Sequence, residues 1–469
     1  GLKVGSEVFI EQLEAGQEFA MISFSDAATV ATPLEIVPAG SATAPWKTHQ
    51  KYLASILTAT GATAIGDALD LGRLQLSSVD VAAVQSLLLL TGGMETAGSL
   101  PAEQAIPDLV ANNVRVFAIG FGTDQNAIVL QKIATATGGK YWPIAESLSA
   151  AEIANALPEV MIYASGEIPE GSMVTAFADL DERIAVELES RPFAWGQIPD
   201  PPAVLSQSPP AVLSHPIEIS AGSKECTLGC FWSRPGAQFD LELIRPDKVQ
   251  ATDKDISRSF RGPRPYAFHV LKRPMPGTWQ LRIRGQEIRG TRFRVFGFQV
   301  HPKIRLEASV ERAIVRPGDE VELRVSVLIP QRIPGATVRA WILSPTGKWS
   351  RVDLLERSAE EPDAGIYVAR IPTIPHVRGG YLVGIDVSRG AGRASFRPWP
   401  ASRLESGRPP RAKIVDIPSL RLRKLVSFVA DDSGRYVGKP LHGTNTKPLS
   451  VPADQRARVQ EWKERRLRR

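Results

Sequence analysis

Two short apolar runs, each closed by glycine, dominate the hydrophobic pattern in the first third of the chain. The first run, Ser86–Leu90, contains four consecutive leucines and ends at Thr91–Gly93. The second run, Val114–Gly120, also ends at a glycine and is followed by Phe121 and Gly122. Short apolar runs bounded by turn residues are typical of strands that are buried on both faces. These runs therefore predict two neighbouring strands inside one sheet.

Helical and extended patterns alternate around these two runs. Helices are expected at 2–13, 46–57, 63–76, 101–112, 125–137 and 148–164, and further strands at 18–25, 29–37 and 138–142. This alternation predicts a doubly wound α/β domain over residues 1–165, with a parallel sheet covered by helices on both faces. Ligands of such sheets bind beyond the carboxyl ends of the strands. The sheet-edge loop Thr91, Gly92, Gly93 and Glu95 is thus the candidate binding site.

Short strands separated by proline and glycine turns replace the alternation after residue 165. Their spacing predicts an antiparallel β-sandwich over residues 166–300 and a second, immunoglobulin-like sandwich over residues 301–398. Residues 399–469 show no domain-sized pattern, although 420–429 is expected to be a strand or a short helix. The chain is 469 residues long, which agrees with about three domains.

Charge is distributed unevenly along the chain, and this changes the picture at both ends. Residues 1–165 hold 7 Lys or Arg against 16 Asp or Glu, a net charge of −9. Residues 399–469 hold 17 Lys or Arg against 7 Asp or Glu, a net charge of +10. The basic tail is expected to be solvated, and nucleic acid or another anionic surface is the alternative partner.

The order of the sequence motifs in residues 1–165 resembles a von Willebrand factor type A domain, most closely the bacterial and chloride-channel-accessory-like group. The matching motifs are Phe24–Asp26, Gly61–Leu69, Leu90–Gly93, Ile119–Gly122 and Thr137–Tyr141. The resemblance implies a protein-binding or adhesion module, an extracytoplasmic or secreted location, and a β-domain after the α/β domain.

The resemblance also implies a metal-ion-dependent adhesion site at the carboxyl edge of the sheet. Such a site binds Mg²⁺ through an Asp-x-Ser-x-Ser loop, a threonine and an aspartate, because hard cations prefer oxygen ligands. Thr63 matches the threonine, but Gly92 stands where the family usually has the aspartate. Glu95 is a substitute carboxylate, and Asp67 is expected to cap a helix or face solvent. We expect a degenerate site without a cofactor, with Mg²⁺ only if an upstream segment supplies the first loop.

The strand that carries the Asp-x-Ser-x-Ser loop in the family has no counterpart in this sequence. It would lie between the strand at 18–25 and the strand at 86–91, so both would expose an unpaired edge. The expectation is either an incomplete N-terminus or a strand donated by another chain.

Catalytic constellations are missing from the sequence. Its six histidines are scattered, and no His-Glu-x-x-His pair, P-loop or nucleophile elbow occurs. The only cysteines, Cys226 and Cys230, are either reduced buried thiols or a local disulfide. No run approaches 18 apolar residues, so no transmembrane segment is expected. We therefore predict a non-enzymatic binding or scaffold protein; the alternative is an accessory subunit of an enzyme complex.

Overall fold

The computed structural model describes most of the chain apart from several loops, the 145–182 region and the C-terminal residues. The described residues are 6, 7, 9–11, 13, 15–56, 62–76, 85–92, 94–121, 126–144, 183–186, 196–197, 211–219, 221–232, 238–261, 266–286, 292–300, 305–329, 331–357, 365–396, 413–417 and 420–432. The helix expected at 148–164 and the basic residues 433–469 lie outside them. No helix among these residues is long and apolar enough to span a bilayer.

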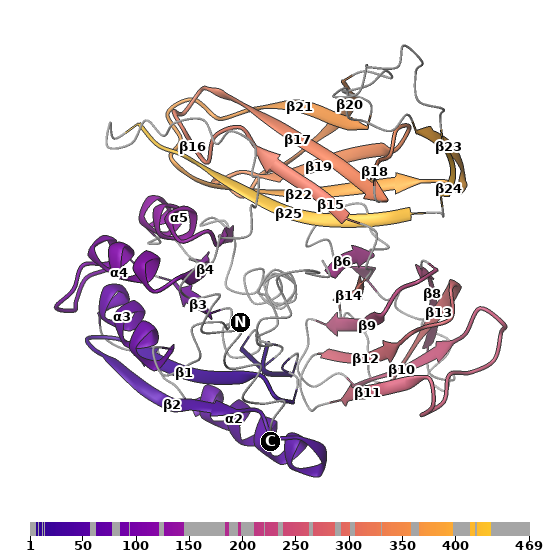
Figure 1. Cartoon of the computed structure of the whole chain (residues 1–469), viewed down its shortest axis with the longest axis horizontal. Helices are drawn as coiled ribbons and strands as arrows, with labels where there is room; N and C mark the ends of the chain where they lie inside the picture. Colours follow the sequence, from indigo (N-terminus) through magenta and orange to yellow (C-terminus); the bar gives the residue numbers. More distant parts are fainter. Residues whose placement is uncertain are drawn as a thin grey trace, which may run out of the picture.

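Three parallel strands form the core of the N-terminal domain, as the apolar runs predict (Figure 1). They are β3 (Gln85–Thr91), β4 (Val114–Phe121) and β5 (Tyr141–Ile144), in the order β3-β4-β5. Leu88 lies opposite Phe117 and Thr91 opposite Gly120, so the carboxyl ends of β3 and β4 meet at one edge. β4 is central, and its apolar side chains from Val114 to Ile119 are buried. The register therefore places the loops that follow β3 and β4 side by side.

The first two strands form a separate antiparallel hairpin, β1 (Glu18–Phe24) and β2 (Ala28–Ile36). Among the described residues, β1 does not pair with β3, so the sheet is interrupted where the sequence predicts a missing strand. One helix, α3 (Ile65–Leu76), contacts both parts. The side chains of Ile22 on β1 and Leu87 on β3 both approach Gly72 of this helix. Helix packing, and not strand pairing, joins the hairpin to the parallel sheet.

The described helices agree with the predicted positions, with one difference. Residues 6, 7 and 9–11 are helical, within the segment 2–13. The further helices are η1 (Gly40–Ala42), α2 (Thr43–Ile56), α3, η2 (Ala102–Ala105), α4 (Ile106–Ala111) and α5 (Ala127–Ala136). The single helix expected at 101–112 is divided into a 3-10 turn followed by a short α-helix. Pro107, in the first turn of α4, has no N–H to donate to a preceding carbonyl, which accounts for this change.

The middle region is a β-sandwich, as predicted. One sheet has the order β10-β13-β8, and its partner includes β11-β12-β9-β14. The strands are β6 (Arg183–Val186), β7 (Gly196–Gln197), β8 (Ala211–Ile219), β9 (Glu225–Trp232), β10 (Gln238–Ile244), β11 (Ile256–Arg261), β12 (Tyr266–Lys272), β13 (Gly277–Gln286) and β14 (Arg292–Val300). Trp279 is 1% exposed between the sheets, and its indole N–H donates to the Met275 carbonyl at 2.8 Å. This turn-and-tryptophan unit anchors the core.

The last region is a second sandwich, and it extends beyond the boundary predicted at residue 398. Its strands are β15 (Arg305–Val310), β16 (Ile314–Val315), β17 (Glu320–Ile329), β18 (Gln331–Arg332), β19 (Thr337–Leu343), β20 (Trp349–Glu356), β21 (Ile366–Pro372), β22 (Gly379–Arg389), β23 (Gly392–Phe396), β24 (Lys413–Ile417) and β25 (Leu420–Ala430). β25 pairs with β22 along its whole length, and Tyr381 stacks on Phe428 in the core. The segment 420–429 is thus a strand of this domain and not part of a separate tail.

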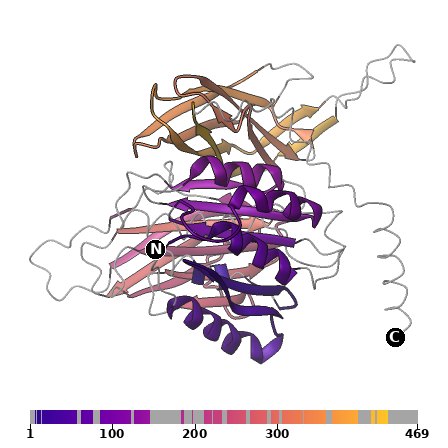
Figure 2. The same cartoon turned by 90° about the vertical axis from the view of Figure 1, so that its left-hand side faces the viewer.

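The N-terminal domain packs against the outer face of β22 and β25 (Figure 2). Val429 on β25 belongs to the apolar core of the N-terminal domain, and the Ser427 hydroxyl donates to the Tyr141 carbonyl on β5. Gly380 on β22 lies opposite Val429 and against Pro143. The two domains therefore share an interface in which glycine allows a close approach.

Candidate functional site

The candidate site lies at the carboxyl edge of the parallel sheet, where the loop after β3 meets the segment that leads into α3. Thr91, the last residue of β3, is 3% exposed, whereas Gly92 is exposed. Gly93 lies outside the described residues. Thr63 comes two residues before α3, and its carbonyl accepts hydrogen bonds from the N–H groups of Thr96 and Ala97 at 3.0 and 3.2 Å. The Thr63 N–H in turn donates to the Thr96 hydroxyl at 3.0 Å. The predicted Thr63 thus joins the loop mainly through its backbone.

Glu95 connects this loop to the starts of two helical segments. Its Oε1 atom accepts a hydrogen bond from the Gly66 N–H of α3 at 2.8 Å. Its Oε2 atom accepts from the Ala102 N–H of η2, also at 2.8 Å. The first N–H groups of a helix have no intrahelical partner, and a carboxylate there satisfies them and is favoured by the helix dipole. Glu95 is therefore a capping carboxylate.

Asp67 makes the reciprocal connection from α3 back to the loop. Its carboxylate accepts from the Ser99 N–H at 3.0 Å, the Leu100 N–H at 2.8 Å and the Ser99 hydroxyl at 3.1 Å. The backbone N–H groups of Ser99 and Leu100 lower the pKa of Asp67 below its ordinary value of 3.8. Asp67 thus holds the turn at Ser99 and Leu100 against α3.

Asp26 is a site residue that sequence reasoning did not identify. It lies in the turn between β1 and β2, and its Oδ1 atom accepts from the Ala62 N–H at 2.7 Å. The Ala64 N–H donates to the neighbouring Ser25 carbonyl at 2.8 Å. These bonds attach the hairpin to the segment before α3. The signal in the sequence was the position of Asp26 directly after a strand, at the same edge as the Thr91 loop.

The oxygen atoms of the described residues at this edge do not fit a hard divalent cation. Such a cation needs about six oxygen ligands, including carboxylates. The Glu95 and Asp67 carboxylates already accept the N–H groups described above, and Gly92 brings no side chain. Among the described residues, no three His, Cys, Asp or Glu side chains form a group that could hold a metal. We therefore derive no chemistry from a cation here.

Lowering the pH should release the loop from α3 through Asp67. Because its folded pKa is depressed, its contribution to stability is fully present above about pH 4 and is lost as the pH falls through the folded pKa. We expect the protection of the Ser99 and Leu100 amides against hydrogen exchange to fall between pH 5 and pH 2, and Asp67→Asn to remove this dependence. Asp70→Asn is the control, since Asp70 binds Arg73 of its own helix. Loss of the pH dependence in both variants would contradict the assignment.

Other polar groups that attract attention in the sequence have structural roles. Cys226 and Cys230 are buried thiols that are not joined in a disulfide, and burial raises the pKa of the Cys226 thiol, which stays protonated. His269 is 4% exposed, and its Nε2–H donates to the Leu241 carbonyl at 3.2 Å. Its Nδ1 atom then accepts from the Ser259 hydroxyl at 2.7 Å. This chain of bonds ties the two sheets of the middle sandwich together.

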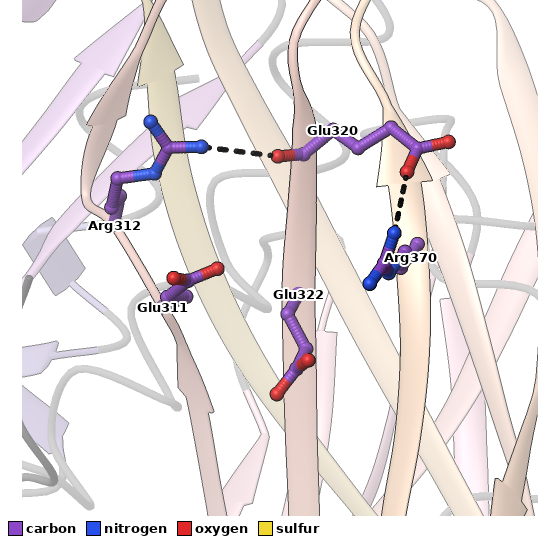
Figure 3. Close-up of a pocket in the computed structure, with 5 residues that line it drawn as sticks. All are labelled: Glu311, Arg312, Glu320, Glu322 and Arg370. Atoms are coloured by element: carbon purple, nitrogen blue, oxygen red, sulfur yellow. Dashed lines mark hydrogen bonds and ion pairs between the residues drawn. The ribbon is translucent and has the colours of Figure 1, made fainter.

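A shallow pocket of about 210 Å³ on the last sandwich is lined by charged side chains (Figure 3). Its lining residues are Glu311, Arg312, Glu320, Glu322 and Arg370. Arg370 is 3.5 Å from the Glu320 carboxylate, and Arg312 donates to the Glu320 carbonyl at 3.5 Å. Both side chains of the Arg370–Glu320 pair are more than half exposed, and exposed ion pairs contribute about 0–1 kcal/mol. We assign this pocket to surface ion pairing.

Comparison with known proteins decides the family of the N-terminal domain. The family model for the von Willebrand factor type A domain matches residues 6–156. The chain contains a von Willebrand factor type A domain. This match agrees with the parallel sheet, the helices and the edge loops described above. No curated protein matches the chain.

Solved structures of three proteins illustrate the similarity. A von Willebrand factor type A protein from Catenulispora acidiphila is 15% identical, with 79% of this chain and 61% of that chain covered and a TM-score of 0.30. Proximal thread matrix protein 1 from the mussel byssus is 24% identical, covering 35% and 40%, with a TM-score of 0.29. The pilus adhesin SpaC from Lactobacillus rhamnosus GG is 9% identical, covering 84% and 51%, with a TM-score of 0.30. The chain thus spans less than two thirds of each of these proteins.

Proposed function

We propose that this chain is a non-enzymatic protein-binding protein, an adhesion or scaffold component, and that the edge loops of its von Willebrand factor type A domain contact the partner. The observation that carries the proposal is the construction of this edge. Loop residues 94–102 are attached to α3 and the segment before it by the Thr63 backbone and by the Glu95 and Asp67 carboxylates, so the surface is ordered before binding. Preorganised surfaces lose less conformational entropy when a partner binds.

The loop after β3 exposes an apolar side chain, Met94, of a type that is common in protein interfaces. Met94 is 51% exposed at the start of the loop, next to Glu95, whose carboxylate accepts hydrogen bonds from the Gly66 and Ala102 N–H groups. Methionine is flexible and polarisable, and it is enriched at protein interfaces. An exposed apolar side chain on a loop that is held by hydrogen bonds, with the exposed residues Gly92 and Thr96 near it in the sequence, fits a protein surface better than a small-molecule substrate.

The proposal is tested by replacing Met94 in the full chain. We expect Met94→Glu to lower the recovery of specifically bound proteins at least tenfold, about 1.4 kcal/mol, because a charge would be buried at the contact. Met275→Glu is the matched control, since Met275 is 39% exposed on the middle sandwich. Proteins that are retained by the parent chain and the control but lost with Met94→Glu support the edge as the binding surface. Identical retention by all three chains would contradict it.

The finer expectations from the sequence stay predictions. They are the relation to the chloride-channel-accessory-like group, an extracytoplasmic location, a strand donated by another chain, a role as an accessory subunit of an enzyme, and binding of nucleic acid or an anionic surface through the basic tail. Each has its own test, and none is required by the edge-loop proposal. Deleting residues 453–469 and measuring salt-dependent binding to a DNA duplex tests the last of them.

A further inference from the structure

The connections between the edge loops have one feature in common. In each of them, a side-chain carboxylate on one segment accepts hydrogen bonds from backbone N–H groups of another segment. Asp26 receives the Ala62 N–H, Glu95 receives the Gly66 and Ala102 N–H groups, and Asp67 receives those of Ser99 and Leu100. Three separate carboxylates therefore tie the β1–β2 turn, the start of α3 and the loop after β3 to one another. A bound cation performs the same task when it shares ligands from several loops.

Glu95 has the central position in this arrangement. Its two oxygen atoms each bind a different helical segment at 2.8 Å, and hydrogen bonds from N–H groups to a carboxylate are stronger than those between neutral groups. The positive ends of these two N–H dipoles point at the carboxylate, so they interact with its negative charge in the way that a cation does. A cation beside Glu95 would meet these same positive ends. The N–H groups of Gly66 and Ala102 therefore already occupy one position beside each oxygen atom of this carboxylate.

The backbone around Glu95 leaves little freedom for a different arrangement. A Cβ atom on Gly66 would lie 1.9 Å from the Leu100 carbonyl oxygen and 2.8 Å from the Ala102 backbone nitrogen. The start of α3 and residues 100–102 are therefore in direct backbone contact. Glu95 lies at this contact and supplies one acceptor to each side of it.

We propose that Glu95 takes the place of a divalent cation as the tie between the loop after β3, α3 and η2, so that the binding edge forms without metal. This inference deepens the proposed function, because it predicts a partner that is recognised by direct contact and not through a shared cation. The bonds that support it are those that the Glu95 carboxylate accepts from the Gly66 and Ala102 N–H groups.

The test uses the full chain without any partner, so that its failure is distinct from failure of the proposed function. Hydrogen exchange at the Gly66 and Ala102 amides is measured in 5 mM EDTA and again with 5 mM Mg²⁺ or Ca²⁺ alone, about the range in which weak sites bind. We expect equal protection in all three conditions. Glu95→Ala should raise exchange at both amides at least tenfold, and Glu95→Gln, which keeps one carbonyl acceptor, should raise it chiefly at one of them.

Glu103→Gln is the matched control. Glu103 lies one residue beyond the Ala102 amide, is half exposed and binds Lys132, so its replacement should leave both amides protected. A rise in protection or in the melting temperature on adding Mg²⁺ or Ca²⁺ to the parent chain would overturn the proposal. Unchanged exchange in Glu95→Ala would overturn it equally, because the carboxylate would then hold nothing together.

Discussion

Gly66→Ala is expected to destabilise the von Willebrand factor type A domain by about 3 kcal/mol, although the same change in an isolated helix would stabilise it by up to about 1 kcal/mol. The reason is the backbone contact between α3 and the loop, since the new Cβ would lie 1.9 Å from the Leu100 carbonyl oxygen and 2.7 Å from the Pro101 carbonyl carbon. Backbone atoms cannot move aside as the end of a side chain can. The loop must therefore separate from the helix.

A second glycine in the same helix provides the control for this prediction. A Cβ on Gly72 would meet the Leu87 Cδ2 atom at 2.7 Å and the Ile22 Cδ1 atom at 3.4 Å, both at the flexible ends of side chains. Gly72→Ala should therefore cost clearly less than Gly66→Ala. Denaturant unfolding, followed by exchange at the Ser99 and Leu100 amides, measures both effects. Equal stability of the two variants would show that the loop does not pack on α3 as described.

Gly380→Ala is expected to separate the von Willebrand factor type A domain from the last sandwich at a cost of about 1–3 kcal/mol. The new Cβ would lie 2.4 Å from the Pro143 Cβ atom and 2.6 Å from its Cγ atom, and the proline ring is rigid. Because Val429 of the sandwich is part of the core of the first domain, we expect both domains of the parent chain to unfold in one transition. In the variant, calorimetry should resolve two transitions.

Gly390→Ala is the matched control for the domain interface. Gly390 directly follows β22, and among the described residues no atom beyond Gly390 and its two chain neighbours lies within 4 Å of the position of its Cβ. This variant should keep the single transition and the exchange protection of β5. Two transitions in the parent chain, unaffected by either substitution, would show that the two domains unfold independently of their contact.

The edge site was partly readable from the sequence. Thr91 and Glu95 were identified because they end or follow an apolar run whose carboxyl end lies at one edge of a parallel sheet. Thr63 was identified only because the order of the motifs resembles a von Willebrand factor type A domain. The role of Glu95 was not readable, because its partners Gly66 and Ala102 depend on the path of the loop between them. Asp26 and Thr96 were missed for the same reason. Hydrogen bonds between residues that are 29 to 36 positions apart produce no periodic pattern in the sequence.

The order of the elements, the parallel sheet and the strand-rich later region follow from the sequence, and so does the edge at which the loop after β3 lies. They follow because burial of apolar side chains imposes a period on each strand and helix. The three-dimensional packing was needed to see that β25 pairs with β22 in the last sandwich and that both strands are covered on their outer face. Leu382 and Leu425 lie on that face and are nearly fully buried. A single strand cannot show which neighbour covers its second face, since that depends on the packing of a domain more than 200 residues away.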